Sequence, residues 1–161
     1  MPSLSEALAL IPALYLLAVA WPLTVIDLRE HRLPNRLVLP AFPIALLCQL
    51  IATIVSADWA RFLFAALTAV VVMIVGLLAN YFEVLGMGDV KLAAAIALVL
   101  SYFDLLLPAV AISLAFILAF GVVLVMIFTG KAKLGSSIPL GPYLLLSFIG
   151  TGGYFLVGLG H

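Results

Sequence analysis

Charged side chains are scarce in this sequence. Its 161 residues include only seven Lys and Arg and seven Asp and Glu, which make up 9% of the chain, whereas 67% of the residues are hydrophobic. Soluble domains are typically about 45–50% apolar and about 25% charged. One core cannot bury so much apolar surface, because a domain of about 150 residues still exposes about 30% of its unfolded surface. The composition therefore excludes an ordinary soluble domain and predicts an integral membrane protein.

Cysteine, histidine and runs of basic residues are also scarce or absent. Cys48 is the single cysteine, so it can form neither an internal disulfide nor a multi-cysteine zinc site. His31 and His161 are far apart and lie in no metal-binding motif, so we expect no metal or other cofactor. The formal net charge is zero and no basic run is present, which disfavours nucleic-acid binding. Because no long polar block remains, we expect residues 1–161 to form one integral-membrane domain without a separate soluble domain.

The few charges divide the chain into long apolar runs. A spanning helix needs about 20 mostly apolar residues, because the hydrocarbon core is about 30 Å thick. Runs without Asp, Glu, Lys or Arg cover residues 7–26, 37–57, 62–82, 92–103, 105–130 and 134–160. The run 92–103 is short, but it can cross if Lys91 and Asp104 lie at the two interfaces, since lysine can snorkel. The sequence thus predicts an all-α membrane protein, a bundle of about six transmembrane helices with short loops.

The basic residues are distributed unevenly among the predicted loops. With six crossings, loops 27–36, 83–91 and 130–137 share one side of the membrane. They contain six of the seven basic residues, namely Arg29, Arg32, Arg36, Lys91, Lys131 and Lys133. Because cytoplasmic loops are enriched in Lys and Arg, we expect these loops in the cytoplasm and both termini outside.

Two acidic residues lie at the cytoplasmic ends of predicted helices. Asp27 follows the first apolar run, where an acid faces the negative end of the helix dipole at a cost of about 0.3–1 kcal/mol. Asp89 ends the segment 86–89, Gly-Met-Gly-Asp, whose glycines leave the backbone bare. Structural roles explain both acids, since Asp27 can mark the interface and pair with a nearby arginine, and Asp89 can cap the next helix. The predicted topology also allows them to lie at one depth in the bilayer.

If the two carboxyl groups also converge laterally, they form an acid/base pair. Two carboxylates about 3 Å apart cannot both ionise readily, so they share a proton. The ionised member can take a proton from water as the water attacks a peptide carbonyl, and the protonated member can donate to the carbonyl oxygen. Acids within a membrane also bind cations or relay protons. A small transporter or ion-conducting protein that uses Asp27 and Asp89 is therefore the main alternative, and a non-catalytic membrane subunit is the second.

Three motifs resemble those of the type IV prepilin peptidases. Residues 27–35, Asp-Leu-Arg-Glu-His-Arg-Leu-Pro-Asn, resemble the first motif of that family, in which an Asp precedes a basic residue and an Ile/Leu-Pro-Asn. Residues 86–92, Gly-Met-Gly-Asp-Val-Lys-Leu, resemble its Gly-x-Gly-Asp motif with the Val-Lys-Leu that follows. Residues 138–142, Ile-Pro-Leu-Gly-Pro, are similar to a further stretch common in the family. The three motifs occur in order, and the resemblance covers nearly the whole chain.

The resemblance implies an intramembrane aspartic endopeptidase in the bacterial cytoplasmic (inner) membrane, with its active site toward the cytoplasm. Its substrate would be a prepilin or pseudopilin with an N-terminal leader and an apolar helix. Carried over to this chain, Asp27 and Asp89 are the catalytic pair. The residues that would shape the site or contact the substrate are Gly86, Gly88, Lys91, Arg32, Pro34 and Asn35.

The chain departs from the long members of that family between the first two predicted helices. Long members carry an insertion there, with paired Cys-x-x-Cys motifs that are associated with zinc and with N-methylation of the new amino terminus. Here only residues 27–36 join the two helices, and Cys48 lies in the middle of the second one. The chain therefore resembles a short, peptidase-only member, as in tight-adherence (Flp-type) pilus systems, without an N-methyltransferase domain.

Overall fold

The computed structural model describes residues 4–130 and 139–158. This part of the chain consists of α-helices and their connections and contains no β-strand, which confirms the predicted all-α class. The helices are α1 (Leu4–Glu30), α2 (Asn35–Val38), α3 (Ala41–Ser56), α4 (Trp59–Tyr81), α5 (Met87–Ser101), α6 (Leu107–Phe128) and α7 (Gly141–Gly158). Lys131, Lys133 and Ile138, which the sequence analysis placed in a loop and a motif, lie outside the described residues.

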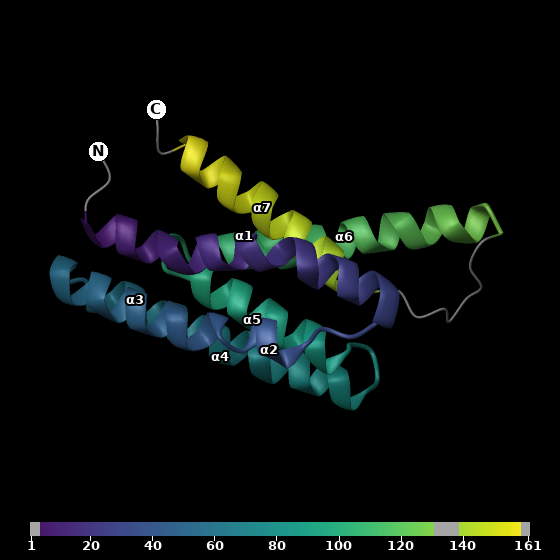
Figure 1. Cartoon of the computed structure of the whole chain (residues 1–161), viewed down its shortest axis with the longest axis horizontal. Helices are drawn as coiled ribbons and strands as arrows, with labels where there is room; N and C mark the ends of the chain where they lie inside the picture. The colour runs from purple at the N-terminus through teal and green to yellow at the C-terminus, as the bar shows by residue number, and fades with distance from the viewer. Residues whose placement is uncertain (1–3, 131–138, 159–161) are drawn as a thin grey trace.

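The helices run back and forth along the long axis of the molecule (Figure 1). The beginning of α1 and the end of α7 lie at the same end of the bundle. The α1–α2 and α4–α5 connections lie at the opposite end, toward which α6 also runs. We call this the pocket end. Asp27 and Asp89 both lie close in sequence to these two connections, so the alternating topology brings both acids to the pocket end.

Two connections at the pocket end are shorter than predicted. α1 continues through Asp27 to Glu30, and α5 begins at Met87, inside the segment 83–91 that the charge pattern indicated as a loop. The prediction of those two boundaries was wrong because charged residues and glycines were taken to end a helix. A helix can continue beyond the apolar run into the interface, where water hydrates its charged side chains. Asp27 and Asp89 are therefore both held on helices.

Among the described residues, four segments are long and apolar enough to cross a membrane, namely Leu4–Glu30, Asn35–Ser56, Trp59–Tyr81 and Leu107–Phe128. They expose large apolar side chains such as Trp21, Ile74 and Phe120, which a bilayer would cover. These segments indicate a multi-pass membrane protein. α5 has only 15 residues, so six crossings with both termini outside stay a prediction.

α5 is the central helix of the bundle and contacts every other helix. Leu92 and the whole stretch 94–101 are buried, as expected for a helix that is apolar on all sides. α4 is its most extensive neighbour and buries only small residues, namely Ala65, Ala69 and Gly76. A Cβ at Gly76 would lie 2.6 Å from Cγ1 of Val90. This close packing fixes the first turn of α5, and with it Asp89.

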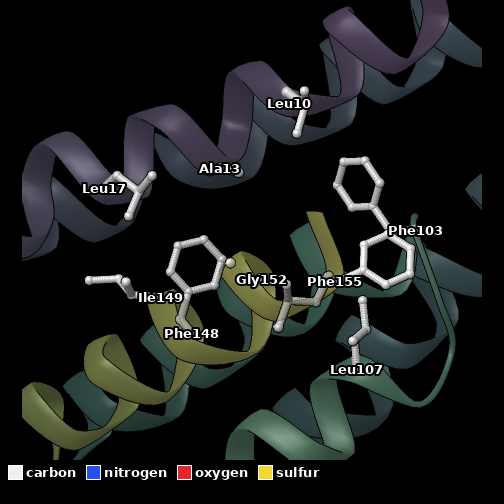
Figure 2. A pocket seen from close by; sticks show the side chains of 11 residues that line it. Leu10, Ala13, Leu17, Phe103, Leu107, Phe148, Ile149, Gly152 and Phe155 are labelled. Atoms are coloured by element: carbon white, nitrogen blue, oxygen red, sulfur yellow. The ribbon is translucent and has the colours of Figure 1, made fainter. Parts of the chain in front are cut away.

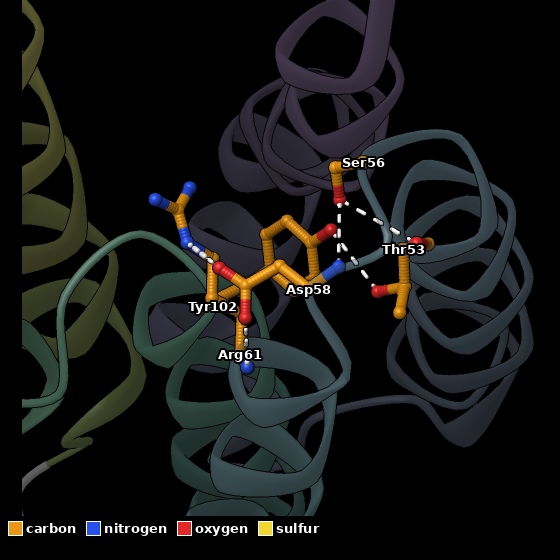
Figure 3. A network of polar contacts seen from close by, with 5 residues as sticks. All are labelled: Thr53, Ser56, Asp58, Arg61 and Tyr102. Atoms are coloured by element: carbon orange, nitrogen blue, oxygen red, sulfur yellow. Dashed lines mark hydrogen bonds and ion pairs between the residues drawn. The ribbon is translucent and has the colours of Figure 1, made fainter.

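The end opposite the pocket end holds a network of paired polar groups (Figure 3). The hydroxyl oxygens of Thr53 and Tyr102 lie 3.2 Å apart. Asp58 is the N-cap of α4 and accepts a hydrogen bond from the backbone N–H of Arg61 at 3.4 Å. The Nε of Arg61 also forms an ion pair with Asp58 at 2.9 Å. The first contact joins α3 to the residue that follows α5, and the other two order the start of α4.

An apolar cavity of about 160 Å³ lies between α1, α7 and the end of α5. Phe103, Phe148 and Phe155 line it together with Gly152 and Gly153 (Figure 2). Its lining residues carry no ionisable side chain. The cavity therefore offers no acid/base chemistry, and the candidate site is sought at the pocket end.

Candidate active site

Asp27 lies in the last turn of α1, and only 4% of it is exposed. Its Oδ2 accepts a hydrogen bond from the backbone N–H of Gly141, the first residue of α7, at 3.0 Å. The chain leaves α1 at His31, which has a positive φ of 51° and donates its N–H to the Asp27 carbonyl at 2.9 Å. In the described part of the chain Asp27 forms no ion pair with an arginine, so interface pairing does not explain its position.

Asp89 lies in the first turn of α5 but does not cap that helix. Gly86 is the N-cap, in an extended conformation, and no side chain caps α5. The Oδ1 atom of Asp89 is buried and has no hydrogen-bond partner among residues 4–130 and 139–158. Burial and then the negative charge of Asp27 raise the pKa of Asp89 to about 7. A buried carboxyl group without a hydrogen-bond partner does not stabilise the fold. Groups with such raised pKa values are concentrated at functional sites.

A pocket of about 300 Å³ brings the two acids together. Its lining residues are Asp27, His31, Arg32, Leu33, Asn35, Gly86, Met87, Gly88, Asp89 and Lys91. Pro34 is the one residue of the predicted set that does not line the pocket. It is instead the N-cap of α2, and its carbonyl accepts hydrogen bonds from the N–H groups of Leu37 and Val38 at 3.0 and 3.3 Å.

The two glycines of the Gly-Met-Gly-Asp segment lie close to different residues. A Cβ at Gly86 would lie 3.0 Å from Oδ2 of Asp89, so this glycine leaves space for the carboxyl group. A Cβ at Gly88 would lie 2.8 Å from Cβ of Leu33 and 3.3 Å from its backbone N. Gly88 therefore allows the segment after α1 to pack directly against the first turn of α5, which closes the pocket on one side.

Lys91 and Asn35 join two walls of the pocket. The Nζ of Lys91 donates a hydrogen bond to Oδ1 of Asn35 at 3.0 Å, between α5 and the start of α2. Arg32 and His31 line the same pocket, so nitrogen-bearing side chains share its lining with the two carboxyl groups.

Residues 14–130 match the type IV leader peptidase family. The matched segment covers more than half of the chain and includes both acids and the glycines beside Asp89. The chain belongs to this family. A search of curated proteins and of solved structures finds no significant match. Membership in the leader peptidase family indicates a peptidase, and the apolar helices place it in the membrane.

The candidate site has one feature that the sequence analysis did not assign. Gly141 occurs in the third motif but was given no role, and it lies beyond the matched residues. Its contact with Asp27 joins residues 114 positions apart through a backbone donor, which leaves no side-chain pattern to find. In residues 4–130 and 139–158 no group of three or more His, Cys, Asp or Glu could hold a metal ion. The ionisable side chains that line the pocket are the two acids, His31, Arg32 and Lys91.

Proposed function

We propose that the protein is an intramembrane aspartic endopeptidase that removes the leader peptide of type IV prepilin-like proteins at the cytoplasmic face of the membrane. The observation that carries the proposal is the single pocket that Asp27 and Asp89 line. Membership in the leader peptidase family supports the substrate class. A prepilin or pseudopilin would enter with its apolar helix in the bilayer and an extended segment at the pocket.

The two acids carry the hydrolysis by moving protons. The ionised carboxylate takes a proton from a water molecule, whose oxygen forms a bond to the scissile carbonyl carbon. The protonated carboxyl gives its proton to the carbonyl oxygen, so a neutral tetrahedral intermediate forms. When this intermediate collapses, the C–N bond breaks and the first carboxyl gives its proton to the leaving amine. One hydroxyl of the intermediate gives its proton back to the second carboxylate as the carbonyl of the new carboxyl group forms. Both acids then regain their starting states, and no metal or covalent intermediate takes part.

The distribution of basic residues supports a cytoplasmic pocket. Arg32, Arg36 and Lys91 lie at the pocket end, and Arg61 lies at the opposite end. Because positively charged loops face the cytoplasm, the pocket end would face inward, and the beginning of α1 and the end of α7 would face outward. In a bacterium this corresponds to the inner membrane. Crossing by α5 would place residues 92–103 in the bilayer and Asp89 at its inner boundary.

Cleavage of candidate prepilins by the purified, reconstituted protein tests the proposal. We expect the wild-type protein to shorten a prepilin by the mass of its leader, and Asp27→Asn to lose this activity while it stays folded and inserted. Asp58→Asn is a matched control, because it changes an acid at the other end of the bundle. Efficient cleavage by the Asp27→Asn variant would refute the mechanism. Ion flux that depends on both acids, without cleavage of any prepilin, would support the transporter instead.

A further inference from the structure

The N-terminus of α7 is directed at one of the two acids. The Gly141 N–H donates to Oδ2 of Asp27 at 3.0 Å in a buried position. The first N–H groups of a helix have no partner within the helix, and the positive end of the helix dipole favours an anion there. Pro142 has no N–H, and the Tyr143 N–H bonds to the Leu140 carbonyl at 3.1 Å. Among residues 141–143, only the Gly141 N–H therefore remains for Asp27.

Gly141 also lies closer to the Asp27 carboxylate than a residue with a Cβ could lie without displacing it. A Cβ at this position would lie 2.6 Å from Oδ2 and 3.2 Å from Cγ of Asp27, so the carboxylate would have to move. Elsewhere on α7, a Cβ at Gly150 would meet nothing within 4 Å. The requirement for glycine is therefore specific to the start of α7, where it faces the acid.

The other acid lacks comparable support. Within the described part of the chain, Oδ1 of Asp89 is buried without a hydrogen-bond partner, and Asp89 sits against the glycine at position 86 rather than against a backbone donor. A buried carboxyl oxygen that lacks a donor is easier to accommodate in a neutral group than in a charged one. The two acids thus have unequal surroundings although they line one pocket.

We propose that Gly141 is a positioning residue that holds Asp27 as the ionised member of the pair, so that Asp27 takes the proton from water and Asp89 donates its proton to the carbonyl oxygen. The inference rests on the proposed peptidase function and assigns the two roles that the mechanism left interchangeable. Gly141 does not line the pocket, so it acts through Asp27 and not on the substrate. Its removal should therefore change the catalytic step and leave substrate binding largely intact.

Gly141→Ala tests the assignment, with Gly150→Ala on the same helix as the matched control. A displacement of about 1 Å can cost about 10²-fold in rate, so we expect kcat for prepilin cleavage to fall by about 10–100-fold with KM nearly unchanged. We also expect the acidic limb of the pH–kcat profile to move to higher pH, because the Cβ displaces the Asp27 carboxylate from the N–H that stabilises its charge. The other ionisable groups around the pocket, His31, Arg32, Asp89 and Lys91, stay in place. Gly150→Ala should keep both the rate and the profile.

A second substitution removes only the hydrogen bond. Glycolic acid in place of Gly141 converts its N–H into an ester oxygen and adds no Cβ, so it decides the matter even if Gly141→Ala does not fold. The same shift of the acidic limb is expected. Unchanged kcat and profile in the ester variant would overturn the role of Gly141, whereas absence of cleavage by the wild-type protein would overturn the peptidase function itself.

Discussion

At the end of the bundle opposite the pocket, the acidic side chains of Asp58 and Asp104 have partners. Asp58 accepts a hydrogen bond from Arg61 and forms an ion pair with it, and Asp104 accepts a hydrogen bond from the Leu106 N–H at 2.7 Å. At the pocket end, Asp89 has a buried oxygen to which none of the described residues forms a hydrogen bond. Paired acids of the first kind cap helices and order turns. An unpaired buried acid stabilises nothing locally, and its proton is available for chemistry.

The largest difference in cleavage rate is expected when one acid is replaced at the pocket end and one at the opposite end. Asn at position 89 keeps the shape of the side chain but cannot exchange a proton, so we expect Asp89→Asn to slow prepilin cleavage by about 10²–10⁴-fold. Asp58→Asn keeps a residue suited to the N-cap, and we expect it to cleave within about twofold of wild type. Mass spectrometry of the product measures both rates, and thermal unfolding checks the fold. Similar losses in the two variants would contradict the distinction between the ends.

The pH dependence of cleavage is a second way to distinguish Asp89 at the pocket end from Asp58 at the opposite end. The mechanism needs one protonated carboxyl, and the pKa of Asp89 is about 7 because of burial and the charge of Asp27. We therefore expect kcat to fall by about tenfold per pH unit above pH 7, on a limb that Asp58→Asn leaves unchanged. A flat profile between pH 7 and pH 9 would show that Asp89 is not the proton donor.

The same pKa makes a prediction for stability. The pKa of Asp89 is higher in the folded protein than the ordinary value of 3.8, so the folded state holds its proton over the pH range in which the unfolded state loses it. The contribution of Asp89 to the free energy of unfolding is fully present below about pH 4 and is lost as the pH rises through 7. Unfolding in detergent measures the free energy of unfolding across this range. We expect it to decline with rising pH in the Asp58→Asn variant, and to decline less in the Asp89→Asn variant. An equal decline of the free energy of unfolding in the two variants would show that the pKa of Asp89 is not raised in the folded protein.

The sequence predicted the helical architecture because its signals are local, and it singled out both acids as candidates whose role stays a prediction. A long apolar run without charges has few alternatives to a membrane helix, and Asp27 and Asp89 stand out as acids beside such runs. The boundaries at Glu30 and Met87 were not predictable from charge alone, because a helix continues into the interface. The contact between Gly141 and Asp27 was not predictable either, since a backbone donor carries no side-chain signature and the two residues meet only after α1 and α7 have packed.

A smaller effect is expected from Gly86→Ala, with Gly121→Ala as its control. The φ of Gly86 is −68°, which alanine adopts readily, but its Cβ would lie 3.0 Å from Oδ2 of Asp89. The carboxyl group must then give way by a few tenths of an ångström, and we expect kcat to fall by about 3–10-fold. A Cβ at Gly121 would meet nothing within 4 Å, so that variant should cleave normally. Equal rates for the two variants would show that the space beside Asp89 is not needed.

The smallest effect on cleavage is expected at Tyr102 and Thr53, whose hydroxyl oxygens lie 3.2 Å apart at the end opposite the pocket. Tyr102 is 4% exposed and Thr53 is fully buried, so Tyr102→Phe leaves the Thr53 hydroxyl without this partner and should lower the free energy of unfolding by about 1–3 kcal/mol. Replacing both residues, as in Thr53→Val with Tyr102→Phe, should cost less than the sum of the two single changes, because no buried hydroxyl is left unpaired. All three variants should cleave prepilin at the wild-type rate where they are folded, since neither residue lines the pocket. A slowed kcat with unchanged stability would mean that the polar network at that end acts on the acids through α5, and that the two ends are not independent.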